Sequence, residues 1–301
     1  MHILDKRDYC KVKPLVTEIP INTLFAQVVL ENKVQGKVYV DNPQNPSACL
    51  IFHPYGMLLL CGKTDNTDFN LKIQEFMLNT HYPNNLWLQV YPGEWSIQIQ
   101  SWLGTRLKKY PWVPDASQSG FSQAEEEFKL LNRHSVVECT RFNFTFNRNK
   151  YQALPPQPVP AEFKIVRVDK ELFHKIPGTV VPRSFWDSNE DFVQSGVGFC
   201  LIRDQKPIST CSTAFVIGKH FEIGIETDTA YRGRGYASLA ARAFIDYCLI
   251  NGLEPVWACR KENLGSYKLA QHLGFEVKCE LPYYGLVNNY SNIVLLSSGM
   301  K

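Results

Sequence analysis

Residues 221–237 read FEIGIETDTAYRGRGYA, and this stretch predicts a β-strand, a glycine-rich turn and the start of a helix, in that order. Its first seven residues alternate between apolar and polar types, which is typical of a half-buried strand. Gly233 and Gly235 allow the turn to take positive φ angles and bring backbone N–H groups close to an anion. A helix directly after the turn adds its unpaired first-turn donors and the positive end of its dipole. The stretch therefore predicts a binding site for a phosphate group.

The segments around this stretch predict an α+β domain with a mixed, mostly antiparallel sheet flanked by helices. Three strands joined by short polar turns lead up to the glycine turn, and the strands and helices alternate after it. Because the helix after the turn crosses over to the next strand, we expect those two strands to be parallel. The predicted strands are 163–168, 197–203, 207–217, 220–227, 255–259 and 275–281, and the predicted helices are 170–176, 188–194, 238–250 and 264–272.

The first half of the chain predicts a second domain, of α/β type. Residues 154–160, LPPQPVP, hold four prolines in seven residues, which excludes a helix or a central strand and favours an extended link. The 301 residues also exceed the size of one small core. We therefore expect an N-terminal domain over residues 1–154 and a C-terminal domain over residues 161–301. In the first, the predicted strands are 36–40, 48–52, 57–61 and 136–146, and the predicted helices are 68–79 and 122–132.

The composition is that of an ordinary globular protein, with 45% apolar residues, 20% charged residues and a formal net charge of +3. Such a small charge does not indicate nucleic acid or a membrane surface as a partner. Nine cysteines without a C-x-x-C pair favour reduced thiols, so we expect a cytoplasmic protein. The seven histidines are dispersed and no metal-ligand spacing is found, so we predict no metal site. No apolar run is long enough to cross a membrane.

Two motifs at a fitting separation make residues 163–281 similar to the GNAT superfamily of N-acetyltransferases. Arg232, Gly235 and Ala237 match its R/Q-x-x-G-x-G/A loop. About thirty residues on, residues 263–275 match the signature N-x-x-x-x-x-L-x-x-x-L-G-F. Residues 36–48, GKVYVDNPQNPSA, resemble a segment in the N-terminal domain of a bacterial two-domain branch of these enzymes. The resemblance implies a GNAT fold after the proline-rich link, and leaves open that residues 1–154 are a degenerate copy of that fold.

The resemblance also implies acetyl-CoA as co-substrate. The backbone of the glycine turn would cradle the pyrophosphate, two arginines would complement its charge, and the strand before the turn would bind the pantetheine arm and polarise the thioester carbonyl. The start of the later helix contacts the cofactor arm in this superfamily, although Asn263 also suits a helix N-cap, and both roles can hold together. The predicted cofactor-binding residues are Ile225, Thr227, Arg232, Gly233, Arg234, Gly235, Tyr236, Ala237, Asn263 and Ser266.

Candidates for proton transfer come from the same strand and helix. Glu222 and Glu226 lie four residues apart on the predicted strand and share a face unless a bulge intervenes, so either carboxylate could accept the proton of an amine. Many relatives place a tyrosine seven residues after the helix asparagine, but this chain has Ala270 there. Tyr267 lies almost one turn earlier and is the tyrosine candidate on this helix. Other possible proton donors are Ser266, Cys259, Tyr283 and Tyr284. Cys259 is expected to be packed in the core rather than to act as a nucleophile, since no histidine partner is evident.

The sequence thus predicts an acyl-CoA-dependent N-acyltransferase that transfers acetyl to a primary amine by direct attack in a ternary complex. Residues 177–186, followed by the acidic residues Asp187, Glu190 and Asp191, are expected to border the acceptor site. The acceptor is a small molecule or a peptide, and the protein is a monomer or a homodimer. The main alternative is a non-catalytic acyl-CoA-binding or sensor protein. An unrelated nucleotide-binding module is a weaker one, because the Gly-Lys-Ser/Thr ending of a P-loop is missing.

Overall fold

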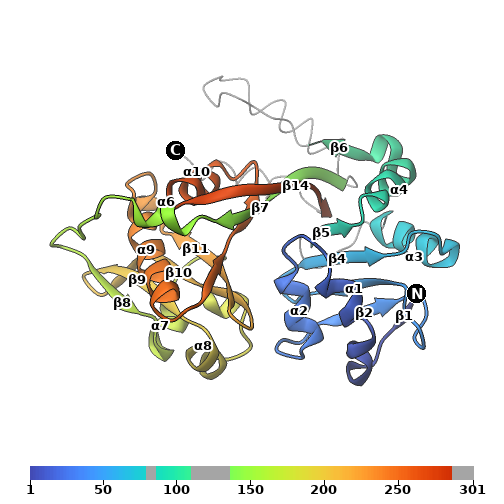
Figure 1. The fold of residues 1–301 in the computed structure, drawn as a ribbon, viewed down its shortest axis with the longest axis horizontal. Helices are drawn as coiled ribbons and strands as arrows, with labels where there is room; N and C mark the ends of the chain where they lie inside the picture. Colours follow the sequence, from blue (N-terminus) through green and yellow to red (C-terminus); the bar gives the residue numbers. More distant parts are fainter. Residues whose placement is uncertain (79–85, 110–135, 287–301) are drawn as a thin grey trace. The chain divides into compact units, whose positions relative to one another are not determined.

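The computed structural model describes residues 1–78, 86–109 and 136–286 (Figure 1). By their contacts, these residues form two compact units. The first contains the described residues of Met1–Arg141, Arg260–Glu262 and residues 280–286, and the second contains Phe142–Cys259 and Asn263–Cys279. That residues 1–154 and 161–301 are separate domains stays a prediction, since a compact unit defined by contacts is not the same as a part that folds on its own.

The second unit contains a five-stranded sheet, and the glycine turn follows one of its strands. Its strand order is β12-β11-β10-β9-β8, and all neighbours are antiparallel except β11 and β12, which are parallel. This confirms the predicted meander with one parallel crossover. The strands are β8 (Lys164–Arg167), β9 (Gly198–Arg203), β10 (Lys206–Ile217), β11 (His220–Thr227) and β12 (Glu254–Val256).

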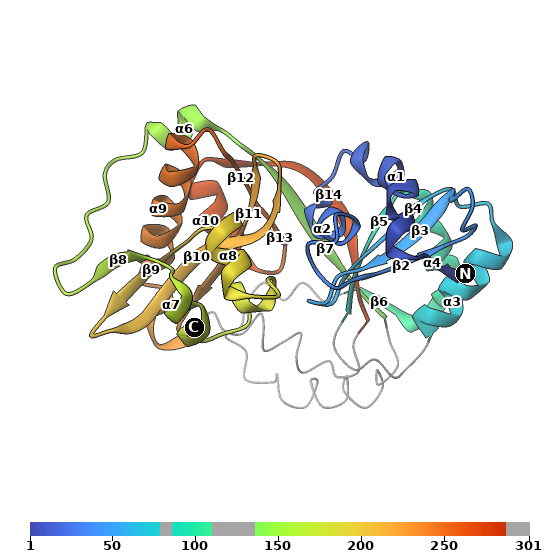
Figure 2. The ribbon, with the colours of Figure 1, turned by 90° about the horizontal axis from the view of Figure 1, so that it is seen from below.

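Helices cover both faces of this sheet. Helix α9 packs against β9, β10 and β11 (Figure 2), and its apolar face joins a large core that includes Phe244 and Ile245. Helices α7 and α8 contribute Phe173 and Phe192 to a smaller core that contains Cys200 of β9. The helices of this unit are α6 (Arg148–Gln152), α7 (Lys170–Lys175), α8 (Asn189–Ser195), α9 (Tyr236–Ile250) and α10 (Leu264–His272).

Residues 255–259 differ from the prediction of a single strand. They divide between β12, in the five-stranded sheet, and β13 (Ala258–Arg260), in the other sheet. Trp257 separates them, because its fully buried ring packs on Phe275 at 5.2 Å and its backbone C=O accepts the N–H of Phe144 at 3.2 Å. The chain therefore leaves β11 directly after Val256.

The other sheet has the order β1-β2-β3-β4-β5-β14-β7-β13, with β6 paired to β7. Strands β2, β3 and β4 form an antiparallel meander, and β4 is parallel to β5 across the crossover helix α3 (Thr67–Leu78). This repeats the β10–β11–α9–β12 order of the second unit, but the turn before α3 reads KTDN at residues 63–66 and has no glycine motif. The strands are β1 (His2–Ile3), β2 (Lys37–Val40), β3 (Ala48–Phe52), β4 (Met57–Gly62), β5 (Leu86–Tyr91), β6 (Leu107–Lys109), β7 (Val136–Phe146) and β14 (Phe275–Leu286).

The helices of the first unit were only partly predictable. The pattern of α3 predicted its buried residues Phe69 and Ile73, whereas α2 is buried almost all round and shows no amphipathic pattern. The predicted helix 122–132 lies outside the described residues. The helices of this unit are α1 (Lys13–Thr17), α2 (Leu24–Leu30), α3 (Thr67–Leu78) and α4 (Glu94–Leu103).

All nine cysteines are free thiols, and seven of them are buried. Burial raises the pKa of Cys248 to about 12, so this thiol stays protonated and packs as a small apolar side chain. In the described ranges, no helix is both long and apolar enough to cross a membrane. The same residues bring together no group of three side chains able to hold a metal ion.

Candidate cofactor and acceptor site

Strand β11 presents its backbone groups in two directions. The C=O of Glu226 accepts a hydrogen bond from Oγ of Ser209 at 3.3 Å, and the N–H of Asp228 donates to the C=O of Ile208 at 2.9 Å. Both partners belong to β10. Because backbone groups alternate in direction along a strand, the residues on either side of Glu226 direct theirs to the opposite edge of β11.

That opposite edge is open close to the glycine turn. β12 pairs with residues 220–222 of β11 and then ends at Val256, and no other strand in the described part of the chain pairs with the edge beyond this point. The C=O of Thr227 is occupied, because it accepts Nε–H of Arg232 at 3.0 Å. The N–H and C=O of Ile225 and the N–H of Thr227 are therefore placed to bond an extended ligand.

The glycine turn has the conformation that its sequence predicts. Gly233 and Gly235 take φ angles of +75° and +79°. A Cβ atom on Gly233 would meet no described atom within 4 Å, and one on Gly235 would meet Nε2 of Gln157 alone, at 3.9 Å. Helix α9 begins at Tyr236, two residues earlier than predicted, and its N-cap Gly235 offers no side-chain acceptor to the first-turn N–H groups. The turn thus leaves the first-turn N–H groups open, as the predicted anion site requires.

The two arginines of the turn have different surroundings. Arg232 is half-buried and donates from Nη2 to Oε1 of Glu226 at 3.0 Å, in addition to its bond with Thr227. Arg234 is exposed, and its guanidinium lies 5.7 Å from the ring centre of Tyr231. The charge of Arg234 is therefore the more accessible of the two to a phosphate, whereas the guanidinium of Arg232 is held at the end of β11.

Glu222 and Glu226 lie on the same face of β11. The register shift between β10 and β11 comes from an extra residue in β10, so β11 continues without a bulge. Between the two glutamates, a Cβ on Gly224 would lie 3.5 Å from Phe185 and from Val180. Residues 177–186, the predicted border of the acceptor site, therefore lie over this face.

The two carboxylates differ in their environments. Glu222 is 3% exposed and lies level with the last residue of β12. The Glu226 carboxylate accepts hydrogen bonds at both oxygens, from Arg232 at Oε1 and from the backbone N–H groups of Thr179 and Val180 at Oε2, at 3.1 and 3.2 Å. Glu226 is thus engaged in local structure in a way that the sequence did not reveal.

At the start of α10, Asn263 acts as the N-cap. Its Oδ1 accepts the backbone N–H of Ser266 at 3.2 Å. The hydroxyl of Ser266 in turn accepts Nε1–H of Trp257 at 3.0 Å. Both predicted cofactor contacts on this helix therefore have structural partners, and their contact with a cofactor stays a prediction.

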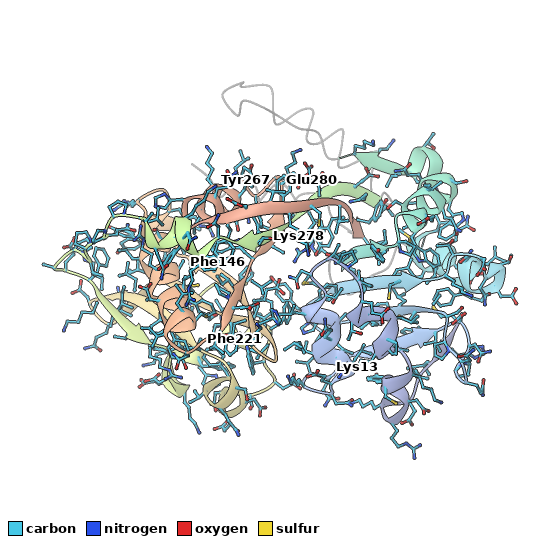
Figure 3. All side chains as sticks on the ribbon, in the orientation of Figure 1. Lys13, Phe146, Phe221, Tyr267, Lys278 and Glu280 are labelled. Carbon is cyan, nitrogen blue, oxygen red and sulfur yellow. The ribbon has the colours of Figure 1, made fainter. Side chains whose placement is uncertain are left out.

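Tyr267, which is labelled in Figure 3, lies on α10. Ala270 follows it by about one turn of the same helix. Tyr267 is half-buried, with its ring 5.1 Å from that of Phe142 and 6.2 Å from that of Phe144. Ala270 is completely buried in the same core. The methyl group of Ala270 cannot donate a proton, and a larger side chain at this position would overpack the core. The position that a tyrosine occupies in many relatives therefore carries no proton donor in this chain.

The sequence did not predict three contacts beside the site, although Thr179 and Val180 fall within the predicted border of the acceptor site. Thr179 and Val180 bond Glu226 through their backbone, and Gln157, from the proline-rich segment, accepts the hydroxyl hydrogen of Ser238 at 2.7 Å. These contacts join residues far apart in sequence, so no local pattern could have indicated them.

A meandering antiparallel sheet, one parallel crossover and a glycine turn at the start of the crossover helix agree with the acetyltransferase fold that the sequence motifs imply. The chain matches the family model of the GNAT acetyltransferases over residues 13–284. The protein belongs to this family and is an acetyltransferase, and the family's reaction is acyl transfer from acetyl-CoA.

Individual proteins agree with this assignment across nearly the whole chain. An uncharacterised N-acetyltransferase of Bacillus subtilis (strain 168), YdfB, is 23% identical over 283 residues, which are 93% of this chain and 97% of that protein. The structure of a GCN5-related N-acetyltransferase-like protein from Streptococcus suis 89/1591 is similar with a TM-score of 0.64 and 22% identity, covering 92% of this chain and 98% of that one.

A tandem GNAT protein of the clavulanic acid biosynthesis pathway has a similar fold as well. Its TM-score is 0.53 at 12% identity, and the match covers 93% of this chain and 95% of that one. The repeated order of strands and crossover helix in the two units agrees with such a tandem arrangement.

Proposed function

We propose that this protein transfers the acetyl group of acetyl-CoA to a primary amine by direct attack within a ternary complex. The observation that carries this proposal is the open edge of β11 at Ile225 and Thr227, which leads directly into the glycine turn and the start of α9. An extended pantetheine arm needs such an edge, and a pyrophosphate needs such a turn.

In this proposal, the chain binds acetyl-CoA mainly through its backbone. The N–H groups of residues 233–237 bond the pyrophosphate, and the exposed guanidinium of Arg234 complements its charge. Ile225 bonds the pantetheine arm as a neighbouring strand would. The N–H of Thr227 polarises the thioester carbonyl and stabilises the negative charge that develops on its oxygen.

Glu222 is the proposed proton acceptor. An ammonium group must lose a proton before its nitrogen can attack, and the buried carboxylate of Glu222 lies on the face that residues 177–186 cover. The amine nitrogen then bonds to the carbonyl carbon, the carbon–sulfur bond breaks, and the sulfur leaves as a thiolate. Tyr267 is retained as the candidate donor that protonates this thiolate. The second proton, which the nitrogen loses as it becomes an amide, replaces the one that Tyr267 gives, so the products are an amide and coenzyme A and one proton is left on Glu222.

Residues 177–186 would select the acceptor, which we take to be a small molecule or a peptide with a free amine. Of the three acidic residues that follow, two already have structural partners: Glu190 pairs with Lys170 at 2.9 Å, and Asp191 accepts from Ser188 at 2.6 Å. Asp187 is exposed and is therefore the acid best placed to attract a cationic acceptor.

The test measures coenzyme A release from acetyl-CoA across a panel of amines, for the wild type and for Glu222→Gln. We expect transfer to at least one amine, with kcat lowered by about 10²- to 10⁴-fold in the variant and a nearly unchanged Kd for coenzyme A, because only proton transfer is lost. Glu276→Gln is the matched control, since that exposed carboxylate pairs with Lys150 on the surface.

Two outcomes would contradict the proposal. Tight binding of coenzyme A without transfer to any amine would indicate a non-catalytic acyl-CoA sensor. Binding of ATP without binding of coenzyme A would indicate a nucleotide-binding module. An unchanged kcat in Glu222→Gln alongside active wild-type enzyme would leave the acetyl transfer standing and overturn the role given to Glu222.

A further inference from the structure

We propose that Glu226 is a positioning residue that couples the cofactor site to the acceptor loop, so that binding of coenzyme A orders residues 178–180. This inference rests on the proposed function, because it takes the glycine turn as the cofactor site and residues 177–186 as the acceptor side. It gives Glu226 a role different from that of Glu222, although the two carboxylates lie on one face of one strand.

The Glu226 carboxylate bonds both sides at once. On the acceptor side, Oε2 accepts the backbone N–H groups of Thr179 at 3.1 Å and Val180 at 3.2 Å, and Oγ1 of Thr179 lies at 3.5 Å. On the cofactor side, Oε1 accepts Nη2–H of Arg232 at 3.0 Å. One side chain therefore joins the loop backbone to the first arginine of the glycine turn.

Arg232 connects the glycine turn to the Glu226 carboxylate. Its Nε donates to the C=O of Thr227 while its Nη2 donates to Glu226, so the guanidinium is fixed by the end of β11 and by the carboxylate. The side chain of Glu226 is 13% exposed and that of Arg232 is 34% exposed. In this partly dry environment, charge-assisted hydrogen bonds are strong, and loss of one partner leaves the other poorly satisfied.

Gly178 provides a second, independent observation. Its φ angle is +113°, and a Cβ atom there would lie 2.5 Å from Cγ of Glu226 and 2.8 Å from its Cδ and Oε2. The loop backbone thus approaches the glutamate more closely than any other residue type would allow. Gly178 thus allows the loop backbone to pack directly against the Glu226 side chain.

Residues 181–186 of the loop are held in place by contacts that do not involve Glu226. Val181 and Phe185 are buried, and Nε1–H of Trp186 donates to the C=O of Thr213 at 2.8 Å. Within the described part of the chain, Thr179 and Val180 are the loop residues whose backbone N–H groups bond the Glu226 carboxylate. These residues lie directly over the face that carries Glu222, so their order sets the shape of the acceptor side.

Both oxygens of the Glu226 carboxylate are engaged, Oε2 by the backbone N–H groups of the loop and Oε1 by Arg232, so its role is assigned to positioning. Coupling between the two sites through Glu226 is reciprocal. Coenzyme A that fixes Arg232 and the glycine turn favours the ordered loop, and an acceptor that binds only to the ordered loop favours binding of coenzyme A.

The experiment is amide hydrogen exchange of the peptide that contains residues 177–186, with and without saturating coenzyme A. In the wild type, we expect coenzyme A to slow exchange of the Thr179 and Val180 amides by about tenfold, the effect of a coupling free energy typical of two linked sites. In Glu226→Gln these amides exchange faster from the start, and coenzyme A no longer protects them. Glu276→Gln, with its carboxylate on the surface, behaves as the wild type.

A second variant and a kinetic measurement keep the test decisive. Gly178→Ala, which disturbs the same contact from the loop side, should remove the same protection even if Glu226→Gln fails to fold. With an amine that the wild type acetylates, we expect Glu226→Gln to raise the acceptor KM by about tenfold and to leave the acidic limb of the kcat–pH profile in place. A lost proton acceptor would instead lower kcat and remove that limb.

The outcomes separate this inference from the proposed function. Bound coenzyme A that gives no added protection in the wild type, or equal protection in Glu226→Gln and Gly178→Ala, overturns the coupling alone. Protection that depends on Glu226, without transfer to any amine, supports the coupling and overturns the enzymatic function. If coenzyme A does not bind, both proposals fail.

Discussion

At the scale of single residues, His53 shows how burial changes acid–base behaviour far from the candidate site. It follows β3, is 3% exposed, and its Nδ1 accepts the backbone N–H of Tyr55 at 3.0 Å. Burial lowers its pKa to about 4, because the charged imidazolium would be poorly solvated there. The folded protein therefore keeps this histidine neutral at a pH where the unfolded chain protonates it.

We predict that His53 makes the protein less stable in mild acid. Its folded-state pKa lies below the unfolded value of 6.5, so the unfolded state binds the extra proton and stability falls as the pH drops from about 6.5 to about 4. The contribution is at most about 3 kcal/mol. Urea unfolding across this pH range, for the wild type and His53→Asn, measures it. Asparagine can still accept the Tyr55 N–H, so the variant should keep the turn and lose most of the pH dependence. An identical slope in both proteins would contradict this prediction.

The two glutamates of β11 show how much of the candidate site could be predicted from the sequence at the scale of residues. Strand alternation alone predicted that Glu222 and Glu226 share a face, and β11 confirms it. Their different surroundings were not predictable, because the N–H groups that bond Glu226 lie at Thr179 and Val180, 47 and 46 residues earlier. Hydrogen bonds to a distant loop leave no periodic mark in the sequence.

At the scale of elements, Asn263 decides how α10 begins. Its Oδ1 caps the helix at the N–H of Ser266, one of the two roles that the sequence left open. We predict that Asn263→Ala lowers the free energy of unfolding by about 1 kcal/mol, whereas Asn263→Asp, which can cap equally well, leaves it nearly unchanged. Chemical denaturation measures this directly.

The same two variants test the other role of Asn263. If its amide also binds the cofactor arm, Asn263→Asp will keep its stability but bind coenzyme A more weakly, since aspartate lacks the N–H donor. Titration with coenzyme A gives this answer independently of the unfolding curve. If Asn263→Ala has the same free energy of unfolding as the wild type, the cap contributes nothing to stability, and the predicted loss of about 1 kcal/mol is wrong.

Elements with clear periodicity were predictable, and elements without it were not. The limits of β3, β7, β11 and α10 agree with the sequence to the residue, because alternation or helical spacing is flanked by turn residues. Helix α2 was missed because six of its seven residues are buried. The division of residues 255–259 into β12 and β13 follows from the burial of Trp257, which no local pattern shows.

At the scale of the whole molecule, the core of the second unit draws on residues that precede the proline-rich segment. Phe142 and Phe144 of β7, and Tyr151 of α6, are 5–8% exposed and belong to the same core as Phe244 and Trp257. A fragment of residues 161–301 would lack all three rings. Each buried aromatic side chain contributes about 1.5–3 kcal/mol, so their loss is comparable with the stability of a typical domain.

We therefore predict that residues 161–301 alone do not fold cooperatively, whereas residues 136–301 do. Thermal unfolding followed by near-ultraviolet circular dichroism distinguishes the two, since fixed aromatic packing gives the signal. The fragments carry the same tag and are compared with the full chain. A sharp transition for residues 161–301 would instead support the domain limits that the proline-rich segment predicts.

The place of β14 in the first sheet has a consequence for synthesis of the protein in the cell. Gln89 of β5 is paired with Tyr283 of β14, so the ribosome must add almost 200 residues after β5 before that strand can gain this neighbour. At about 5–20 residues per second, this takes roughly 10–40 s. During that time the edge of β5 is exposed to other nascent chains, and this interval is when a chaperone that binds strand edges would be needed.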